Sequence, residues 1–150
     1  MGNRLTREDA VEAGRVTPAV IGWLQRALRH EFAAARQFTL QAVVAGRLGD
    51  AALAAECERG AQDELLHARR FALELVEASA PLGDGAPLNL PVGATVMEIL
   101  ENARATEAQA VRLYREGARA SRGLGRAQRL FEQIGAEEAL HWEELNRRLR

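Results

Sequence analysis

The sequence contains two Glu-x-x-His motifs, and each of them follows another glutamate at nearly the same distance. The motifs begin at Glu64 and Glu138. Glu31 precedes the first motif and Glu107 precedes the second, with nearly equal spacing in the two halves of the chain. Helical bundles that hold two metal ions in their core use such a set of four carboxylates and two imidazoles. We therefore expect six metal ligands, which are Glu31, Glu64, His67, Glu107, Glu138 and His141.

Local sequence signals predict an all-α chain, because good helix formers fill long windows and the alternation typical of strands does not persist. Thr17-Pro18 is a typical helix start, Asp50 is placed to cap a second helix, and Thr95-x-x-Glu98 has the pattern of a capping box. We expect helices over about residues 18–46, 50–79, 95–121 and 125–150. Residues 17–150 would then form one four-helix bundle, after an N-terminal extension over residues 1–16 with a short helix at residues 3–15.

The connection over residues 80–94 contains three prolines and three glycines, so it cannot be helical throughout. When extended it can span at most about 50 Å, whereas a helix of about 27 residues is about 40 Å long. The connection is therefore long enough to cross the whole bundle. We expect two antiparallel helix pairs joined by this long crossover.

The six candidate ligands are matched in depth along the predicted helices. Glu31 and Glu64 lie at nearly equal distances before and after a turn centred near residue 48. Glu107 and Glu138 are placed in the same way about a second turn near Gly123. Each glutamate also takes the place of an apolar residue in the inward-facing stripe of its own helix, and each histidine lies one turn further along the same stripe. We therefore expect all six side chains to meet near the middle of the core.

The charges of these residues also favour metal binding. An unpaired buried carboxylate costs several kcal/mol, and two divalent cations would balance four of them. Carboxylate and imidazole ligands suit iron or manganese. A single Glu-x-x-His on a helix is more often a solvated pair, but two matched copies are not explained that way.

Other polar and aromatic residues are given structural roles. His30 lies one step off the inward stripe, so we expect it at the surface or rim. Glu137 is expected to be exposed or to support a ligand, and Asp63 to receive a histidine N–H or to face solvent. Cys57 is expected to be a small buried filler on the stripe.

Composition excludes several classes of protein. The 150 residues suit one domain, and no stretch approaches the roughly 20 unbroken apolar residues of a membrane helix. The N-terminus lacks the apolar segment of a secretory signal, and a single cysteine excludes a Cys-x-x-Cys site. A net charge of −1, with 20 basic and 21 acidic residues, argues against nucleic-acid binding. We expect a cytoplasmic protein.

From about Leu24 to Leu149 the chain resembles the bacterioferritins and, more broadly, the ferritin-like di-iron carboxylate superfamily. The strongest stretches are residues 28–38, Asp63-Glu-Leu-Leu-His-Ala68 and Glu137-Glu-Ala-Leu-His-Trp142. The resemblance implies that the six candidates are the ligands of a di-iron ferroxidase site. It also implies that the protein binds Fe(II), oxidises it with dioxygen or peroxide, and serves iron storage or detoxification as a homo-oligomer.

The sequence departs from the bacterioferritin pattern at three places. Leu65 stands where the family carries its haem-ligating methionine, so we predict no haem. Phe38 replaces the usual tyrosine near the metals, and Tyr114, seven residues after Glu107, is a candidate to take over that neighbourhood. The sequence stops nine residues after His141, so the fifth helix that lines an axis of the usual cage is expected to be missing. A dimer or smaller ring is then an alternative to a cage.

Two other classes of function stay open at this point. The first is a di-metal oxidoreductase without storage, rubrerythrin-like or catalase-like, with iron or manganese as the metal. An oxygenase would belong to this class and would need a substrate pocket. The second is a structural helical module that binds metal without catalysis.

Overall fold

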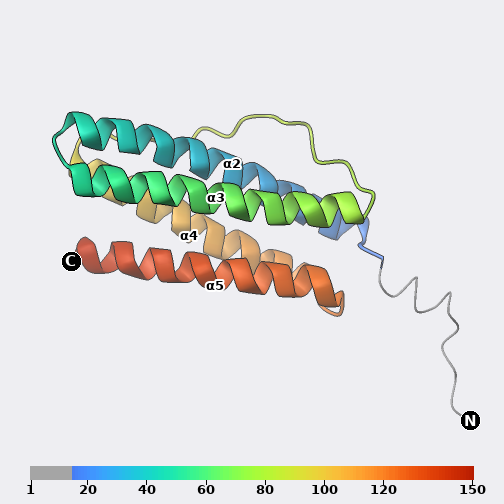
Figure 1. Ribbon diagram of the computed structural model, residues 1–150. Coiled ribbons are helices and arrows are strands. Elements are labelled where there is room, and N and C mark those ends of the chain that lie inside the picture. Colours follow the sequence, from blue (N-terminus) through green and yellow to red (C-terminus); the bar gives the residue numbers. More distant parts are fainter. Residues whose placement is uncertain (1–14) are drawn as a thin grey trace, which may run out of the picture.

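The computed structural model describes residues 15–150 as four long helices and a long connection (Figure 1). The helices are α2 (Pro18–Arg47), α3 (Ala51–Glu77), α4 (Val96–Ala120) and α5 (Gly125–Arg148). The all-α class and the four predicted helices are confirmed, with ends within a few residues of the predicted ones. The short helix predicted at residues 3–15 lies largely outside the described residues.

The predicted caps explain where three helices begin. Thr17 accepts a hydrogen bond from the N–H of Val20, and Pro18 occupies the first turn of α2. Asp50 accepts from the N–H of Leu53 at the start of α3. Thr95 and Glu98 form a reciprocal capping box at the start of α4, as predicted. Such side-chain caps satisfy backbone donors that have no partner within the helix.

The long connection runs back along the outside of α2, so that α3 and α4 are joined across the length of the bundle (Figure 1). Two buried glutamines of α2 hold its far end. Gln37 donates to the carbonyl of Pro91 at 2.6 Å, and Gln41 donates to the carbonyl of Val92 at 3.0 Å. The hydroxyl of Thr106 on α4 donates to the side-chain oxygen of Gln37 at 2.7 Å. The crossover is therefore fixed to α2 and α4 by hydrogen bonds within the core.

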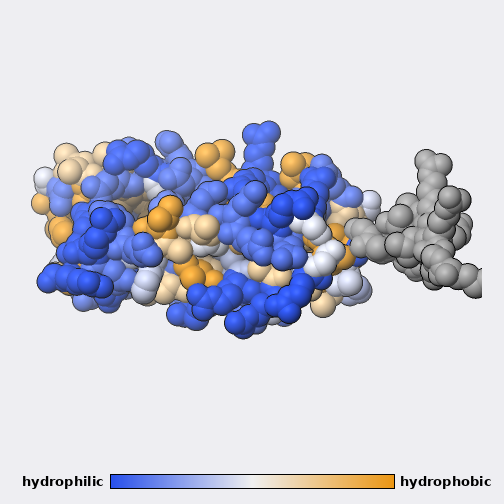
Figure 2. Space-filling model, turned by 90° about the horizontal axis from the view of Figure 1, so that it is seen from below, coloured by the Kyte–Doolittle hydropathy of each residue, from blue (hydrophilic) through white to orange (hydrophobic). Residues whose placement is uncertain are grey.

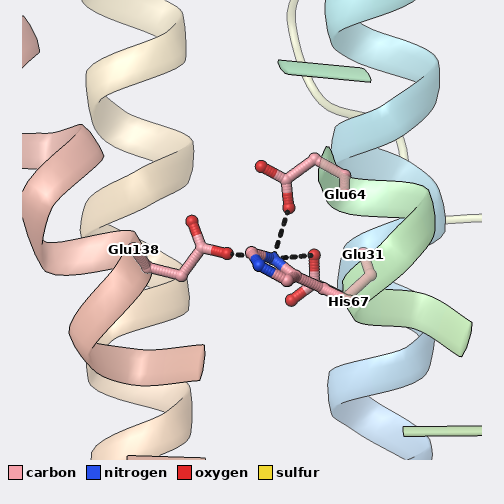
Figure 3. Close-up of side chains that lie close together, drawn as sticks. All are labelled: Glu31, Glu64, His67 and Glu138. Atoms are coloured by element: carbon pink, nitrogen blue, oxygen red, sulfur yellow. Dashed lines mark ion pairs between the residues drawn. The ribbon is translucent and has the colours of Figure 1, made fainter. Parts of the chain in front are cut away.

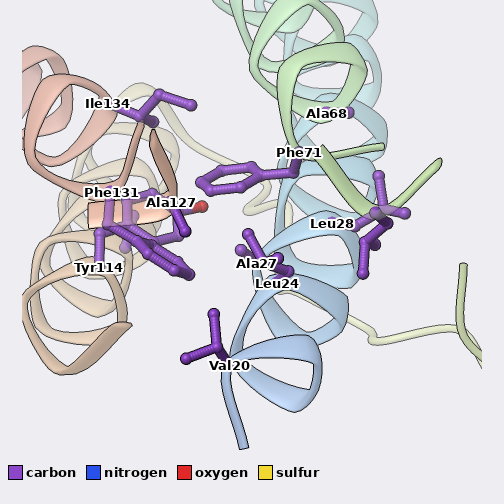
Figure 4. Close-up of a cluster of buried hydrophobic side chains, with 12 residues drawn as sticks. Val20, Leu24, Ala27, Leu28, Ala68, Phe71, Tyr114, Ala127, Phe131 and Ile134 are labelled. Carbon is purple, nitrogen blue, oxygen red and sulfur yellow. The ribbon is translucent and has the colours of Figure 1, made fainter. Parts of the chain in front are cut away.

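One end of the bundle is filled by aromatic side chains (Figure 4). The ring of Phe71 lies 5.2 Å from that of Tyr114 and 5.5 Å from that of Phe131, measured between centroids. All three are fully buried. Gly117 makes this packing possible, because a Cβ atom there would lie 2.4 Å from the Phe131 ring. This cluster closes one end of the core against water.

The opposite end of the bundle is less tightly closed. Helices α2 and α3 pack along their lengths, as do α4 and α5, but α3 and α5 touch only sparsely. Leu145 of α5 and Leu149, the residue that follows this helix, are only half-buried. They pack against the buried cluster that contains Leu53, Ile99 and Leu100, and Leu145 also lines an opening between the helices. The face of the molecule seen from below in Figure 2 is mostly hydrophilic, with separated apolar side chains.

No helix within residues 15–150 combines the length and the apolar character that crossing a membrane requires.

Candidate metal centre

Every helix of the bundle contributes at least one side chain to a polar cluster near the middle of the core. Helices α2 and α4 each contribute one glutamate, whereas α3 and α5 each contribute a glutamate and a histidine one turn later. Five of the six side chains are buried, and the side chain of His141 is 39% exposed. The six residues are Glu31, Glu64, His67, Glu107, Glu138 and His141. The structure brings together all six candidates from the sequence, and their role as ligands stays a prediction.

The cluster forms two overlapping groups, and either group could hold a metal ion. One group has ligand atoms from Glu31, Glu64, His67 and Glu138. In the other group, Glu107 and His141 replace Glu31 and His67. Within each group the ligand atoms lie within 4.8 Å of one another. Because Glu64 and Glu138 belong to both groups, the two positions are adjacent and share two carboxylates.

Several of these buried atoms have no hydrogen-bond partner within residues 15–150. They include Oε2 of Glu31, Nδ1 of His67 and both carboxylate oxygens of Glu138. Nδ1 of His67 lies 2.6 Å from Oε1 of Glu138 without forming a hydrogen bond to it, and 3.5 Å from Oε2 of Glu64 (Figure 3). Leaving such atoms unsatisfied in a core costs about 1–3 kcal/mol each, and more when the group is charged. Oxygen and nitrogen atoms that converge in this way fit a divalent cation.

The orientation of His67 is set from outside the cluster. Its Nε2 lies 2.7 Å from Oε2 of Glu137 on α5, and Arg70 donates to the other oxygen of Glu137 at 3.1 Å. The Nε2–H group therefore donates to Glu137, and Nδ1 faces the other carboxylates. Fixing a histidine in this way is typical of metal ligands. Glu137, whose side chain is 47% exposed, thus has the supporting role that the sequence allowed, whereas Asp63 is exposed.

Tyr114 contacts Glu31, and so lies in the neighbourhood for which the family resemblance made it a candidate. The tyrosine is fully buried on α4, and its hydroxyl donates to Oε1 of Glu31. Burial, together with the charge of Glu31, raises the pKa of Tyr114 well above its ordinary value. The hydroxyl therefore keeps its proton and acts as a donor.

The prediction that His30 lies at the surface or rim is wrong. Its side chain is buried, with 5% exposed, and its ring lies edge-on to Tyr114 at 6.4 Å between centroids. The physical reason is that α2 contacts both α3 and α4, so a wider arc of this helix is buried than a single stripe. The sequence signal for this wider arc was a set of small residues beside the stripe, which are Ala27, Ala33 and Ala34. Burial lowers the pKa of His30 and favours the neutral ring.

The titratable groups of the cluster shift one another's pKa values. Burial raises the pKa values of Glu64 and Glu107 well above the ordinary value, and the neighbouring carboxylates raise them further. Burial alone would lower the pKa of His67, but the carboxylates of Glu138, Glu31 and Glu64 raise it overall. The contact with Glu138 raises the pKa of His141. In the metal-free protein, protons therefore partly balance the buried negative charge.

The fold and the cluster together define a four-helix bundle with a candidate two-metal centre in its core. The family model for the ferritin-like domain matches residues 21–150, and the chain belongs to this family. Its fold is also similar to a solved structure of the bacterioferritin of Rhodobacter capsulatus, with a TM-score of 0.86 and 24% sequence identity. The match covers 90% of this chain and 86% of the bacterioferritin chain, which is described as having a metal-free dinuclear site and a haem iron. The comparison with curated proteins finds no match.

Proposed function

We propose that this protein is a di-iron ferroxidase of the bacterioferritin type. It binds two Fe(II) ions and oxidises them with dioxygen or peroxide, for iron storage or detoxification. The observation that carries this proposal is the pair of overlapping four-residue groups that share Glu64 and Glu138. With dioxygen, two Fe(II) ions give up two electrons, and dioxygen takes these electrons and two protons to become hydrogen peroxide.

The side chains divide into shared and terminal ligands in this proposal. Glu64 and Glu138, which belong to both groups, would hold both iron ions, whereas Glu31 and Glu107 would each hold one. His67 binds through Nδ1, because Nε2 donates to Glu137. Two Fe(II) ions bring four positive charges to four buried carboxylates. This balance offsets the cost of burying the carboxylates as charged groups.

Iron is the substrate in this account, and manganese is the alternative metal for the same ligands. No haem is part of the proposal, because the side chain at the position of the family's haem methionine is Leu65. We propose a cytoplasmic homo-oligomer of at least two copies. Exposed apolar side chains along α2 and α3 support an interface between copies, among them Phe32, Val43, Leu66, Leu73 and Val76.

A di-metal oxidoreductase that does not store iron is the second candidate function. It is favoured by a cavity of about 700 Å³ between α3 and α5 that reaches Glu107 and His141. A protein that oxidises iron without storing it would form a dimer and release the ferric iron. A ferritin would form a large assembly and would retain far more iron per chain than the dimer does. The iron retained per chain after aerobic addition and desalting, together with the assembly size, separates these two functions.

The proposed activity is tested by the rate of aerobic Fe(II) oxidation in the wild type and in Glu138→Gln. The variant loses a charged ligand of both positions, so we expect its rate to fall to that of buffer. Glu143→Gln, an exposed position on the same helix, is the matched control and should oxidise iron at the wild-type rate. Normal oxidation by a folded Glu138→Gln variant would refute the site. If the wild type oxidises Fe(II) no faster than buffer does, the remaining function is that of a structural helical module that binds metal.

A further inference from the structure

The cavity between α3 and α5 connects the surface with one end of the candidate metal centre. Its volume is about 700 Å³, within the range of about 300–1,000 Å³ that is common for small-molecule sites. Glu107 and His141 line it, and Glu107 is only 3% exposed. Most of the remaining inner wall is apolar and consists of Phe38, Leu53, Ile99, Leu100, Ala103 and Leu145. A molecule in this cavity would lie beside two of the proposed ligands.

The cavity exists because small residues line it where the helices separate. Cys57 and Gly60 of α3 and Ala103 of α4 leave space that larger side chains would fill. The backbone does not require glycine at position 60. The nearest atoms to a Cβ atom there belong to the Phe38 ring, at an ordinary contact distance of 3.5 Å. The space is therefore a property of the side chains and can be filled by substitution.

The charges at the mouth of the cavity pair with one another. Arg148 forms an ion pair with Glu56 across the opening, and Glu144 pairs with Arg147. Arg59 and Asp63, which also line the cavity, carry opposite charges. The charged groups around the mouth therefore leave no clear excess of either sign, and the mouth does not select a strongly charged ligand. The inner end, by contrast, offers Glu107 and His141 as hydrogen-bonding groups. The fitting ligand is uncharged, has an apolar body and carries a hydroxyl group.

We propose that this cavity binds a small aromatic diol of the hydroquinone class, which returns electrons to oxidised iron. This role rests on the proposed ferroxidase function. A flat ring suits an apolar wall that includes Phe38, and a hydroxyl group suits the end at Glu107 and His141. The diol loses two electrons and two protons and becomes a quinone. Each of two ferric ions gains one electron, and the protons leave to solvent. Oxidised iron would thereby become Fe(II), which can leave the site.

Binding is tested first on the metal-free protein, by two readouts. Calorimetry measures the binding of hydroquinone itself. Cys57, the only cysteine of the chain, lines the cavity and reports its occupancy through its reaction with uncharged methyl methanethiosulfonate. When hydroquinone fills nine-tenths of the cavities, the thiol should react about tenfold more slowly.

Gly60→Leu is the variant that fills the cavity, and its binding heat should disappear. Gly22→Leu is the matched control, because a Cβ atom at Gly22 meets nothing within 4 Å and this residue does not line the cavity. The control should bind hydroquinone like the wild type. A melting curve followed by circular dichroism checks that both variants fold. The thiol protection is measured on the wild type, so this readout holds even if a variant does not fold.

The electron transfer is then tested on anaerobic, ferric-loaded protein. We expect one quinone for every two Fe(II) ions trapped by a chelator, with a rate that falls at least several-fold in Gly60→Leu. Binding without quinone would overturn the reductant role, as would equal rates in the wild type and Gly60→Leu. A thiol that reacts equally fast with and without hydroquinone would show that the ligand binds elsewhere, which would also overturn the proposal. Hydroquinone binding by a protein that does not oxidise Fe(II) would refute the ferroxidase function while supporting the binding site.

Discussion

His67 and Glu137 are joined by a 2.7 Å contact between Nε2 and a carboxylate oxygen, and this contact leaves Nδ1 directed at the buried carboxylates. The supporting residue thus comes from α5, whereas the histidine belongs to α3. Arg70 holds the other oxygen of Glu137. The ring of His67 is therefore oriented by a chain of contacts that begins at the surface.

Glu137→Ala should weaken metal binding without removing a ligand. Loss of a group that orients a metal-bound histidine typically costs about 10–100-fold in affinity. The affinity for Mn(II), measured by electron paramagnetic resonance, should fall by about that factor. Glu132→Ala, at an exposed position on the same helix, should leave the affinity unchanged. An unchanged affinity in Glu137→Ala would show that the contact does not orient the ligand.

Tyr114→Phe should destabilise the metal-free protein, because Glu31 loses its hydroxyl donor and remains buried. We expect a loss of about 1–3 kcal/mol in the free energy of unfolding, measured by urea denaturation. Metal binding should recover part of this loss, since a cation can satisfy the carboxylate. Equal stability of the variant and the wild type without metal would contradict the donor role of Tyr114.

The metal-free protein should lose stability as the pH rises from about 5 to about 8. Glu64 and Glu107 have pKa values raised above 4.5, and those of His67 and His141 are raised above 6.5. A group with a raised pKa holds its proton more tightly in the folded state than in the unfolded state. The contribution of such a group to the free energy of unfolding therefore falls as the pH rises through this range. The lowered pKa values of Glu138 and His30 have the opposite effect. The range of Glu138 lies below 4.5, and His30 offsets only part of the loss, below pH 6.5.

Added Mn(II) should reverse this trend, because a cation takes the place of the protons. The increase in Tm caused by Mn(II) should therefore be larger at about pH 8 than at about pH 5. Scanning calorimetry with and without the metal provides the comparison. A metal-induced increase in Tm that shrinks as the pH rises would contradict the competition between protons and cations.

Gln37→Leu should loosen the crossover. The variant removes the donor to the carbonyl of Pro91 and the acceptor of the Thr106 hydroxyl, and each buried group left unpaired costs about 1–3 kcal/mol. Gln62→Leu, at an exposed position of α3, is the matched control and should change stability little. Amide hydrogen exchange would show faster exchange near residues 91–99 in the first variant alone. Equal exchange rates near residues 91–99 in the two variants would mean that these hydrogen bonds do not hold the crossover.

The helices, the crossover and the meeting of the six candidates could be predicted from the sequence, because each depends on a regular repeat. Side chains one helical turn apart share a face, and equal distances from a turn place residues at equal depth. The capping residues Thr17, Asp50 and Thr95 marked the helix starts for an equally local reason.

Features that depend on how the helices lie against one another could not be predicted. The burial of His30 follows from the contact of α2 with two neighbours, and a single stripe does not show it. The sequence did not decide whether Glu137 is exposed or supports a ligand, because its partner His67 lies 70 residues away in the chain. The cavity beside Glu107 arises where α3 and α5 separate, and Leu145, which lines it, is only half-buried.

The most direct test of the two-metal centre is anomalous diffraction at the iron absorption edge from crystals soaked anaerobically with Fe(II). We expect two iron peaks per chain, with Glu64 and Glu138 in contact with both and the other contacts made by Glu31, His67, Glu107 and His141. A single peak, or peaks only at surface carboxylates, would contradict this expectation.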